Sequence, residues 1–192
     1  TELAQTTTAG ETRTFQVTAR GANGAVLTGY TGTVRFTSTD PQAILPADYT
    51  FTVADQGVRT FSADLRTAGF QTISVTDASA SVTVQAGIQV NPAIAVRLAI
   101  SGPSNVKANN SFSVTVTARD AYGNVATGYR GTVRAASSDP NAVLPANYTF
   151  TPADNGVFTF TGLVLKKKGN QTIAFNDIST VTIAGSLSIG VK

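Results

Sequence analysis

The sequence predicts an all-β protein made of two tandem copies of one antiparallel β-sandwich. Residues 29–61 return 99 positions later as residues 128–160, and 23 of the 33 paired positions are identical, so the chain repeats one folding unit. Its apolar residues are mostly Val, Ala, Ile, Leu and Phe interleaved with Thr, a mixture typical of strands. No stretch has the periodicity of a helix, and 192 residues at this period give two domains of ordinary size.

The repeat divides the chain into a first domain at residues 1–91 and a second at residues 92–192. The junction at residues 88–101 contains the last strand of copy one and the first strand of copy two. Asn91 and Pro92 lie between these strands, which leaves few residues for a hinge. We therefore expect a short, stiff linker.

Alternation of apolar and polar residues predicts the individual strands. In residues 14–20, Phe15 and Val17 alternate with polar residues, which is typical of a strand with one buried face. Residues 21–24 follow with Gly and Asn, which tolerate positive φ, so we expect a hairpin with residues 32–38. Further strands of copy one are expected near residues 49–51, at Phe61, and near residues 72–76, 81–84 and 88–91. Copy two repeats them near residues 113–119, 131–137, 148–150, 158–160, 172–176 and 181–183.

A crossing loop is expected where the pattern SxDPxAxLPAxY occurs, at residues 38–49 and 137–148. Two prolines in each loop exclude both a central strand and a helix interior. Ala43, Ile44 and Leu45 are apolar within the first of these loops. We expect them to pack across an open end of the sandwich.

About seven short strands per copy, with turns every eight to twelve residues, form the pattern of an immunoglobulin-like sandwich. The stretches RDAYGNVATGYRGTV and SSDPNAVLPANYTFTPADNGV resemble the tandem bacterial immunoglobulin-like repeats of large secreted and surface proteins, in the style of invasin-type adhesins. The resemblance covers nearly the whole chain, although copy one departs from the DAYGN turn at Gly21. It implies an extracellular stalk, spacer or filament building block that contacts neighbouring repeats or subunits head to tail. It also implies an adhesive alternative, in which the module binds a cell-surface glycan or a host protein.

The composition argues against catalysis. The chain has no His and no Cys, so acid–base chemistry depends on carboxylates and lysines. Carboxylate pairs of the kind that glycosidases or Ca²⁺ sites use would have to come from Asp40 with Asp55, or from Asp139 with Asp154. Each of these residues precedes a proline or lies in a turn beside a glycine, where a carboxylate caps backbone N–H groups. We expect structural caps, and no catalytic residue, metal site or cofactor.

Four tyrosines recur at the same positions of the two copies, namely Tyr30, Tyr49, Tyr129 and Tyr148. Exposed tyrosines would stack on sugar rings. Their repetition favours a place in the core, where the ring is buried and the hydroxyl bonds to backbone.

The net charge of +3 hides an asymmetry. Residues 1–93 carry five Arg and seven acidic residues, whereas the rest carries nine basic and four acidic residues. Lys166, Lys167 and Lys168 form one basic run, which fits either a solvated turn or a patch for an anionic partner such as a polysaccharide. Without interleaved aromatic residues or a recognition helix, we expect no nucleic-acid binding.

No apolar run reaches the roughly 18 residues of a membrane-spanning helix.

The first strand of copy one is expected to be largely missing. Thr1 aligns with Ile100, so copy one has no equivalent of most of the strand that residues 94–101 supply to copy two. An unpaired sheet edge there would make the first domain the less stable one. Two explanations stay open: the strand was removed when this segment was separated from a longer array, or a neighbouring molecule supplies it by strand addition.

Overall fold

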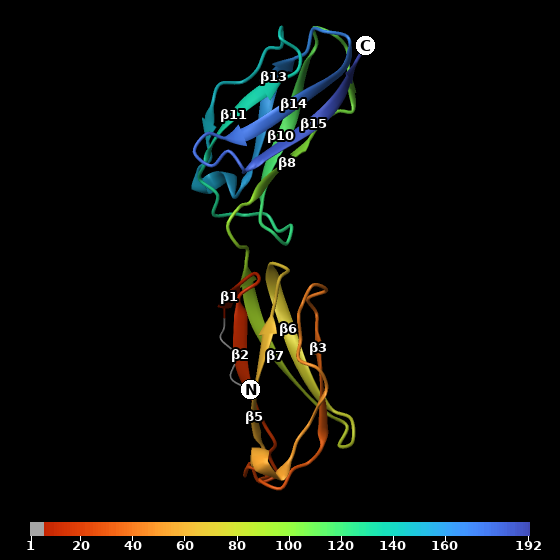
Figure 1. Cartoon of the computed structure of the whole chain (residues 1–192), viewed down its shortest axis with the longest axis vertical. Helices are drawn as coiled ribbons and strands as arrows, with labels where there is room; N and C mark the ends of the chain where they lie inside the picture. The colour runs from red at the N-terminus through yellow and green to blue at the C-terminus, as the bar shows by residue number, and fades with distance from the viewer. Residues whose placement is uncertain (1–5) are drawn as a thin grey trace. The chain divides into compact units, whose positions relative to one another are not determined.

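The computed structural model describes residues 6–192 (Figure 1). It separates into two compact units, unit 1 at Thr1–Asn91 and unit 2 at Pro92–Lys192. Each unit contains a larger and a smaller β-sheet, and the helical elements of the described residues are two short 3-10 turns, η1 (Val53–Asp55) and η2 (Pro152–Asp154). The all-β, immunoglobulin-like fold that the sequence predicts is confirmed.

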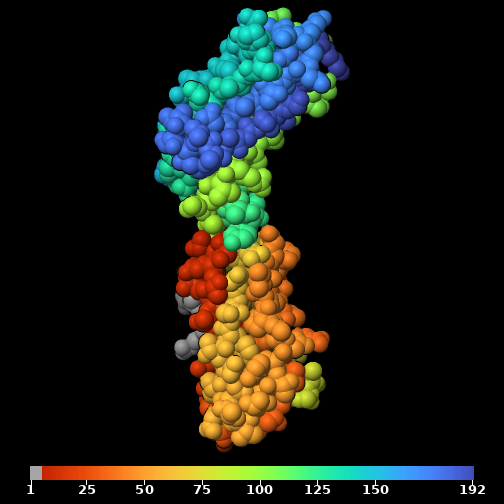
Figure 2. Space-filling model, in the orientation of Figure 1, coloured from red at the N-terminus to blue at the C-terminus, as the bar shows by residue number. Residues whose placement is uncertain are grey.

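Unit 1 pairs a five-stranded sheet of order β1-β7-β6-β3-β4 with a two-stranded sheet of β2 and β5. Its strands are β1 (Thr6–Thr8), β2 (Thr12–Thr18), β3 (Thr33–Ser38), β4 (Tyr49–Thr50), β5 (Val58–Asp64), β6 (Gly69–Asp77) and β7 (Val82–Asn91). β2 and β5 pair without a register break, and Figure 2 shows them side by side on the surface of unit 1, with β2 in red and β5 in golden yellow.

Unit 2 has a five-stranded sheet of order β12-β11-β14-β15-β9, and its smaller sheet has three strands in the order β13-β10-β8. Its strands are β8 (Arg97–Ser101), β9 (Asn105–Val106), β10 (Ser111–Arg119), β11 (Thr132–Ser137), β12 (Tyr148–Thr149), β13 (Val157–Val164), β14 (Gly169–Asp177) and β15 (Ala184–Val191). β8 covers the outer edge of β10. Within residues 6–192, no strand pairs with the corresponding edge of β2 in unit 1.

The strands bury alternate side chains, as the sequence predicts. Along β2, Phe15 and Val17 are buried, whereas Thr14 and Gln16 are exposed. Each fully buried aliphatic or aromatic side chain contributes about 1.5–3 kcal/mol, so these alternate positions hold the two sheets together. The buried core of unit 2 includes Leu98, Val114, Val116, Phe150, Leu163, Leu165, Ile173, Phe175 and Ile189.

The hairpin expected after the first long strand is wrong. β2 and β3 belong to different sheets, because β2 pairs with β5 whereas β3 pairs with β4 and β6. After β2 the chain turns back only as far as one isolated bridge between Arg20 and Val26. It then crosses to the larger sheet, where the ring of Tyr30 packs edge-on against Phe51 with centroids 5.1 Å apart. The aromatic side chain therefore draws the segment across the sandwich.

The crossing loop of unit 1 packs only in part as expected. Ala43 and Leu45 are half-buried, but Ile44 is 50% exposed. The backbone of Ile44 instead pairs with Asp64, at the end of β5. The expectation for the Ile44 side chain is thus wrong, because the loop uses this residue to cover a strand edge with its backbone.

Candidate functional site

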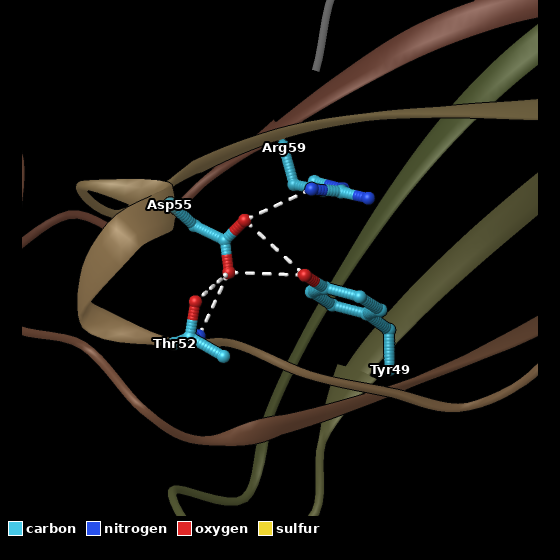
Figure 3. Close-up of polar contacts among 4 residues, drawn as sticks. All are labelled: Tyr49, Thr52, Asp55 and Arg59. Atoms are coloured by element: carbon cyan, nitrogen blue, oxygen red, sulfur yellow. Dashed lines mark hydrogen bonds and ion pairs between the residues drawn. The ribbon is translucent and has the colours of Figure 1, made fainter.

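Asp55, one of the carboxylates that the sequence offers for chemistry, lies at the end of η1 and is surrounded by donors (Figure 3). It accepts hydrogen bonds from the Thr52 backbone N–H at 2.7 Å, the Thr52 hydroxyl at 2.9 Å and the Tyr49 hydroxyl at 3.0 Å. Arg59 Nη1 donates to it at 3.1 Å. The Thr52 N–H is the largest of the contacts that hold the pKa of Asp55 below its ordinary value. The side chain is only 6% exposed, so its carboxylate is occupied by the turn that it caps.

The same set of contacts recurs in unit 2 around Asp154. Its carboxylate accepts the Thr151 N–H at 2.6 Å and the Tyr148 hydroxyl at 3.1 Å, and the Thr151 N–H is the largest cause of its lowered pKa. Phe158 replaces Arg59 here and stacks on Tyr148 with ring centroids 3.7 Å apart. The hydrogen bonds persist without an arginine at the position of Arg59, so the repeated feature is the capped turn.

Asp40 and Asp139, the other two candidate acids, fasten the crossing loops. Asp139 is 2% exposed and accepts the backbone N–H groups of Lys166 at 2.6 Å and Lys167 at 2.9 Å. The Lys167 N–H is the largest cause of the lowered pKa of Asp139. Asp40 accepts the two equivalent N–H groups in unit 1. Each carboxylate thus ties its loop to the turn that follows β5 or β13.

The candidate acids do not form pairs. Asp55 precedes β5 and Asp40 binds the turn that follows β5, so the seven-residue strand separates them by about 20 Å. Asp139 and Asp154 are separated in the same way by β13. Glycosidase carboxylates lie about 5–9.5 Å apart, so this geometry excludes both a catalytic pair and a shared Ca²⁺. Across residues 6–192, no three His, Cys, Asp or Glu residues come together as a metal site would require.

The repeated tyrosines contact the core, but their hydroxyls bond to carboxylates where backbone partners were expected. Tyr129 is 8% exposed and donates to the buried Asp177 at 2.5 Å, and Tyr30 makes the same bond to Asp77. Burial, and then the bond to Asp177, raises the pKa of Tyr129; the equivalent causes raise the pKa of Tyr30 to about 12. Hydrogen bonds from Ser79 and then from Tyr30 lower the pKa of Asp77 to about 2. Both pairs link the segment before β3 or β11 to the end of β6 or β14.

The basic run lies in the exposed turn between β13 and β14. The backbones of Lys166 and Lys167 are held by Asp139, so the turn is anchored. The ion pairs found in residues 6–192 all involve arginines, and none joins Lys166, Lys167 or Lys168 to a carboxylate. Three ammonium groups therefore face solvent on one anchored turn.

Asp120 has a role that the sequence did not reveal. It is fully buried and accepts the N–H groups of Tyr122 at 3.0 Å, Asn124 at 2.8 Å and Ala93 at 3.0 Å. An Asp that opens a DAYGN turn signals the first two bonds. The bond to Ala93, 27 residues away, follows only from the fold. Unit 1 has Gly21 at this position and makes no such bond.

A groove of about 930 Å³ runs beside the free edge of β2 in unit 1. Residues 14–20 form one side of it, and Val82 and Val84 of β7 lie on the other, 54% and 44% exposed. Its lining also includes the core side chains of Phe15, Val17, Val34, Phe51 and Val75. Within residues 6–192, the edge of the smaller sheet is therefore unpaired, and apolar core side chains form part of the groove beside it.

No protein-family model matches the sequence, and no curated protein matches it. Solved structures do match. The D00-D0 domain of intimin matches 98% of this chain and 95% of its own, at 14% identity and a TM-score of 0.50. FdeC, an Escherichia coli adhesin, matches 98% of this chain at 18% identity and a TM-score of 0.49, and this chain spans 62% of that structure. A glycosyl hydrolase family 2 member from Bacteroides cellulosilyticus matches 96% of this chain and 28% of its own, at 12% identity and a TM-score of 0.46.

The match to intimin concerns the fold. It confirms, at that level, the resemblance to the immunoglobulin-like repeats of invasin-type adhesins. The chain thus has the architecture of tandem immunoglobulin-like modules such as those of intimin. In the described part of the chain, no helix is long and apolar enough to cross a membrane.

Proposed function

We propose that the chain is a structural segment of an extracellular bacterial surface protein, in which two domains, residues 1–91 and 92–192, act as a stalk, a spacer or a filament building block. One observation carries the proposal: in each unit a short strand near the N-terminal end, β1 or β9, lies parallel to the last strand, β7 or β15. In unit 1, Thr6–Thr8 run alongside the end of β7, and the next N–H, of Ala9, donates to the Asn91 carbonyl at 2.8 Å. β9 and β15 are arranged in the same way.

This arrangement suits a segment under tension. When the two ends of a unit are pulled apart, parallel neighbours must slide along each other, so their hydrogen bonds are loaded together and not one after another. The aspartates that the two copies share also support a structural role. Asp40, Asp55, Asp139 and Asp154 are occupied by internal hydrogen bonds, so we propose that the segment is not an enzyme.

Pulling single molecules of the chain from its two ends tests the mechanical proposal. We expect two separate unfolding events that release about 300–330 Å and about 330–360 Å of chain, from 91 and 101 residues at about 3.3–3.6 Å per residue. Ala9→Pro removes a bond to β7 and should lower the force of one event only. Thr8→Pro is the matched control, because the Thr8 N–H bonds to the Glu11 side chain and not to β7. Equal forces in Ala9→Pro and the parent chain would contradict the proposal.

An adhesive role is the second candidate, and the anchored turn at Lys166, Lys167 and Lys168 supports it. Three unpaired ammonium groups on a fixed backbone suit an anionic cell-surface glycan or an acidic patch of a host protein. Binding of the chain to arrays of sulfated glycans and host proteins separates the candidates. The adhesive role predicts saturable, salt-sensitive binding that disappears when all three lysines are changed to Gln. The spacer role predicts no saturable binding in either protein.

A further inference from the structure

We propose that the free edge of β2 and the groove beside it form a strand-acceptor site in unit 1. Its occupant is the joining segment of another repeat of this kind, an extended chain with the chemistry of residues 94–101. This is a binding surface within unit 1, and the proposal stands independently of any mechanical role.

Unit 2 shows such a segment in place. β8 pairs antiparallel with β10, and Leu98 lies opposite Ala118. Both side chains are buried in the core of unit 2, Leu98 at 4% and Ala118 at 0% exposed. The repeat places Ala19 of unit 1 where Ala118 lies, and Ala19 is half-buried and lines the groove. A leucine of an added strand therefore has a matching apolar position over Ala19.

Within residues 6–192, no strand pairs with the outer edge of β2. The Ala19 N–H donates toward β5, to the Gly57 carbonyl at 2.8 Å. Since backbone groups alternate in direction along a strand, the N–H groups of Gln16 and Thr18 point to the open edge. Natural proteins protect such edges with charges, prolines or bulges, and residues 14–19 have none of these.

One side chain sets how tightly a strand fits. Gly185 pairs with Phe175 in unit 2, and Val84 pairs with Val75 at the same place in unit 1. A Cβ atom on Gly185 would lie 2.0 Å from the carbonyl oxygen of Leu98. Val84 carries that Cβ, so a strand added to unit 1 must displace Val84 or lie farther from β7. A strand added to unit 1 is consequently held less tightly than β8 is held in unit 2.

Residue-resolved amide hydrogen exchange of the full chain tests the site. We expect the Gln16 and Thr18 N–H groups to exchange about tenfold faster or more than Thr115 and Thr117, whose partners lie in β8. Extending the chain before Thr1 by IAVRLA, the sequence of residues 94–99, should slow Gln16 and Thr18 to the rates of their counterparts. The free peptide IAVRLAIS should do so in a saturable manner. A peptide with Asp in place of its Leu is the control and should have no effect.

Two variants locate the strand. Val84→Gly clears its path and should tighten peptide binding about tenfold, the equivalent of relieving about 1.4 kcal/mol of overpacking. Val82→Gly removes the same side chain two residues away without clearing the path, so it should not tighten binding. The proposal is overturned if Gln16 and Thr18 are already as protected as Thr115 and Thr117, or if the Asp peptide protects them equally.

Discussion

Replacing Gly185 by alanine tests directly how unit 2 holds β8. The new Cβ atom would lie 2.0 Å from the carbonyl oxygen of Leu98 and 2.9 Å from its carbonyl carbon. Both are backbone atoms of an edge strand, so no side-chain rotation relieves the contact. We expect β8 to leave its place beside β10.

The size of the effect follows from what β8 buries. Release of the strand exposes Leu98, and burial of one leucine is worth about 1.5–3 kcal/mol. The backbone hydrogen bonds that are lost are offset by the chain entropy that the freed residues regain. We therefore expect Gly185→Ala to lower the free energy of unfolding of unit 2 by about 1.5–3 kcal/mol. For a domain of this size that lowers the melting temperature by roughly 6–24 °C.

Thermal unfolding and amide exchange at Thr115 and Thr117 measure the outcome, because both residues pair with β8. Gly128→Ala is the matched control, since a Cβ there meets nothing within 4 Å. It should leave the stability unchanged or slightly increased. If Gly185→Ala is as stable as this control and both amides stay protected, the reasoning about β8 is refuted.

Tyr129→Phe should lower the free energy of unfolding of unit 2 by about 1.5–3 kcal/mol in urea titrations, because a buried carboxylate loses a hydrogen bond. Tyr30→Phe should cost less, because Tyr30 is more exposed. The pKa of Asp77 is lowered to about 2, so its stabilising effect is present above the ordinary pKa of about 3.9 and is lost as the pH falls toward 2. Melting curves between about pH 5 and pH 2 should show this loss in the parent chain and a smaller loss in Asp77→Asn. Residues 92–192 expressed alone should unfold cooperatively in calorimetry at the temperature of unit 2 in the full chain, because the core and the β8 edge are both complete.

Short-range patterns predicted most strands. The errors lie where a contact between residues distant in the sequence determines the extent of a strand. The sequence predicts separate strands near residues 81–84 and 88–91, but β7 is continuous from Val82 to Asn91. A Cβ atom on Gly87 would lie 2.3 Å from Cζ of Phe70, so the glycine marks the place where an aromatic ring covers the strand. A ring from the neighbouring strand cannot be seen in the local pattern.

The same distinction applies to the candidate acids. That Asp40 and Asp55 cap backbone N–H groups was predictable, because one precedes a proline and the other lies beside a turn glycine. That Tyr30 bonds to Asp77, 47 residues away, was not, because the topology of the sandwich brings these residues together. Sequence alone therefore gave the local role of each carboxylate and missed the partners that join distant strands.

The two copies differ in the residues that contact the joining segment. In unit 2, Asp120 binds the N–H of Ala93 and Gly185 leaves room for the backbone of Leu98, so two separate features hold the incoming strand. Unit 1 has Gly21 and Val84 at these positions, and it lacks the carboxylate as well as the space. It nevertheless keeps the pairing edge and the apolar side chains that form part of the groove. The edge of β2 and the groove allow a strand to pair with unit 1. The carboxylate and the space that hold β8 in unit 2 are absent there, so a strand that pairs with unit 1 should bind reversibly.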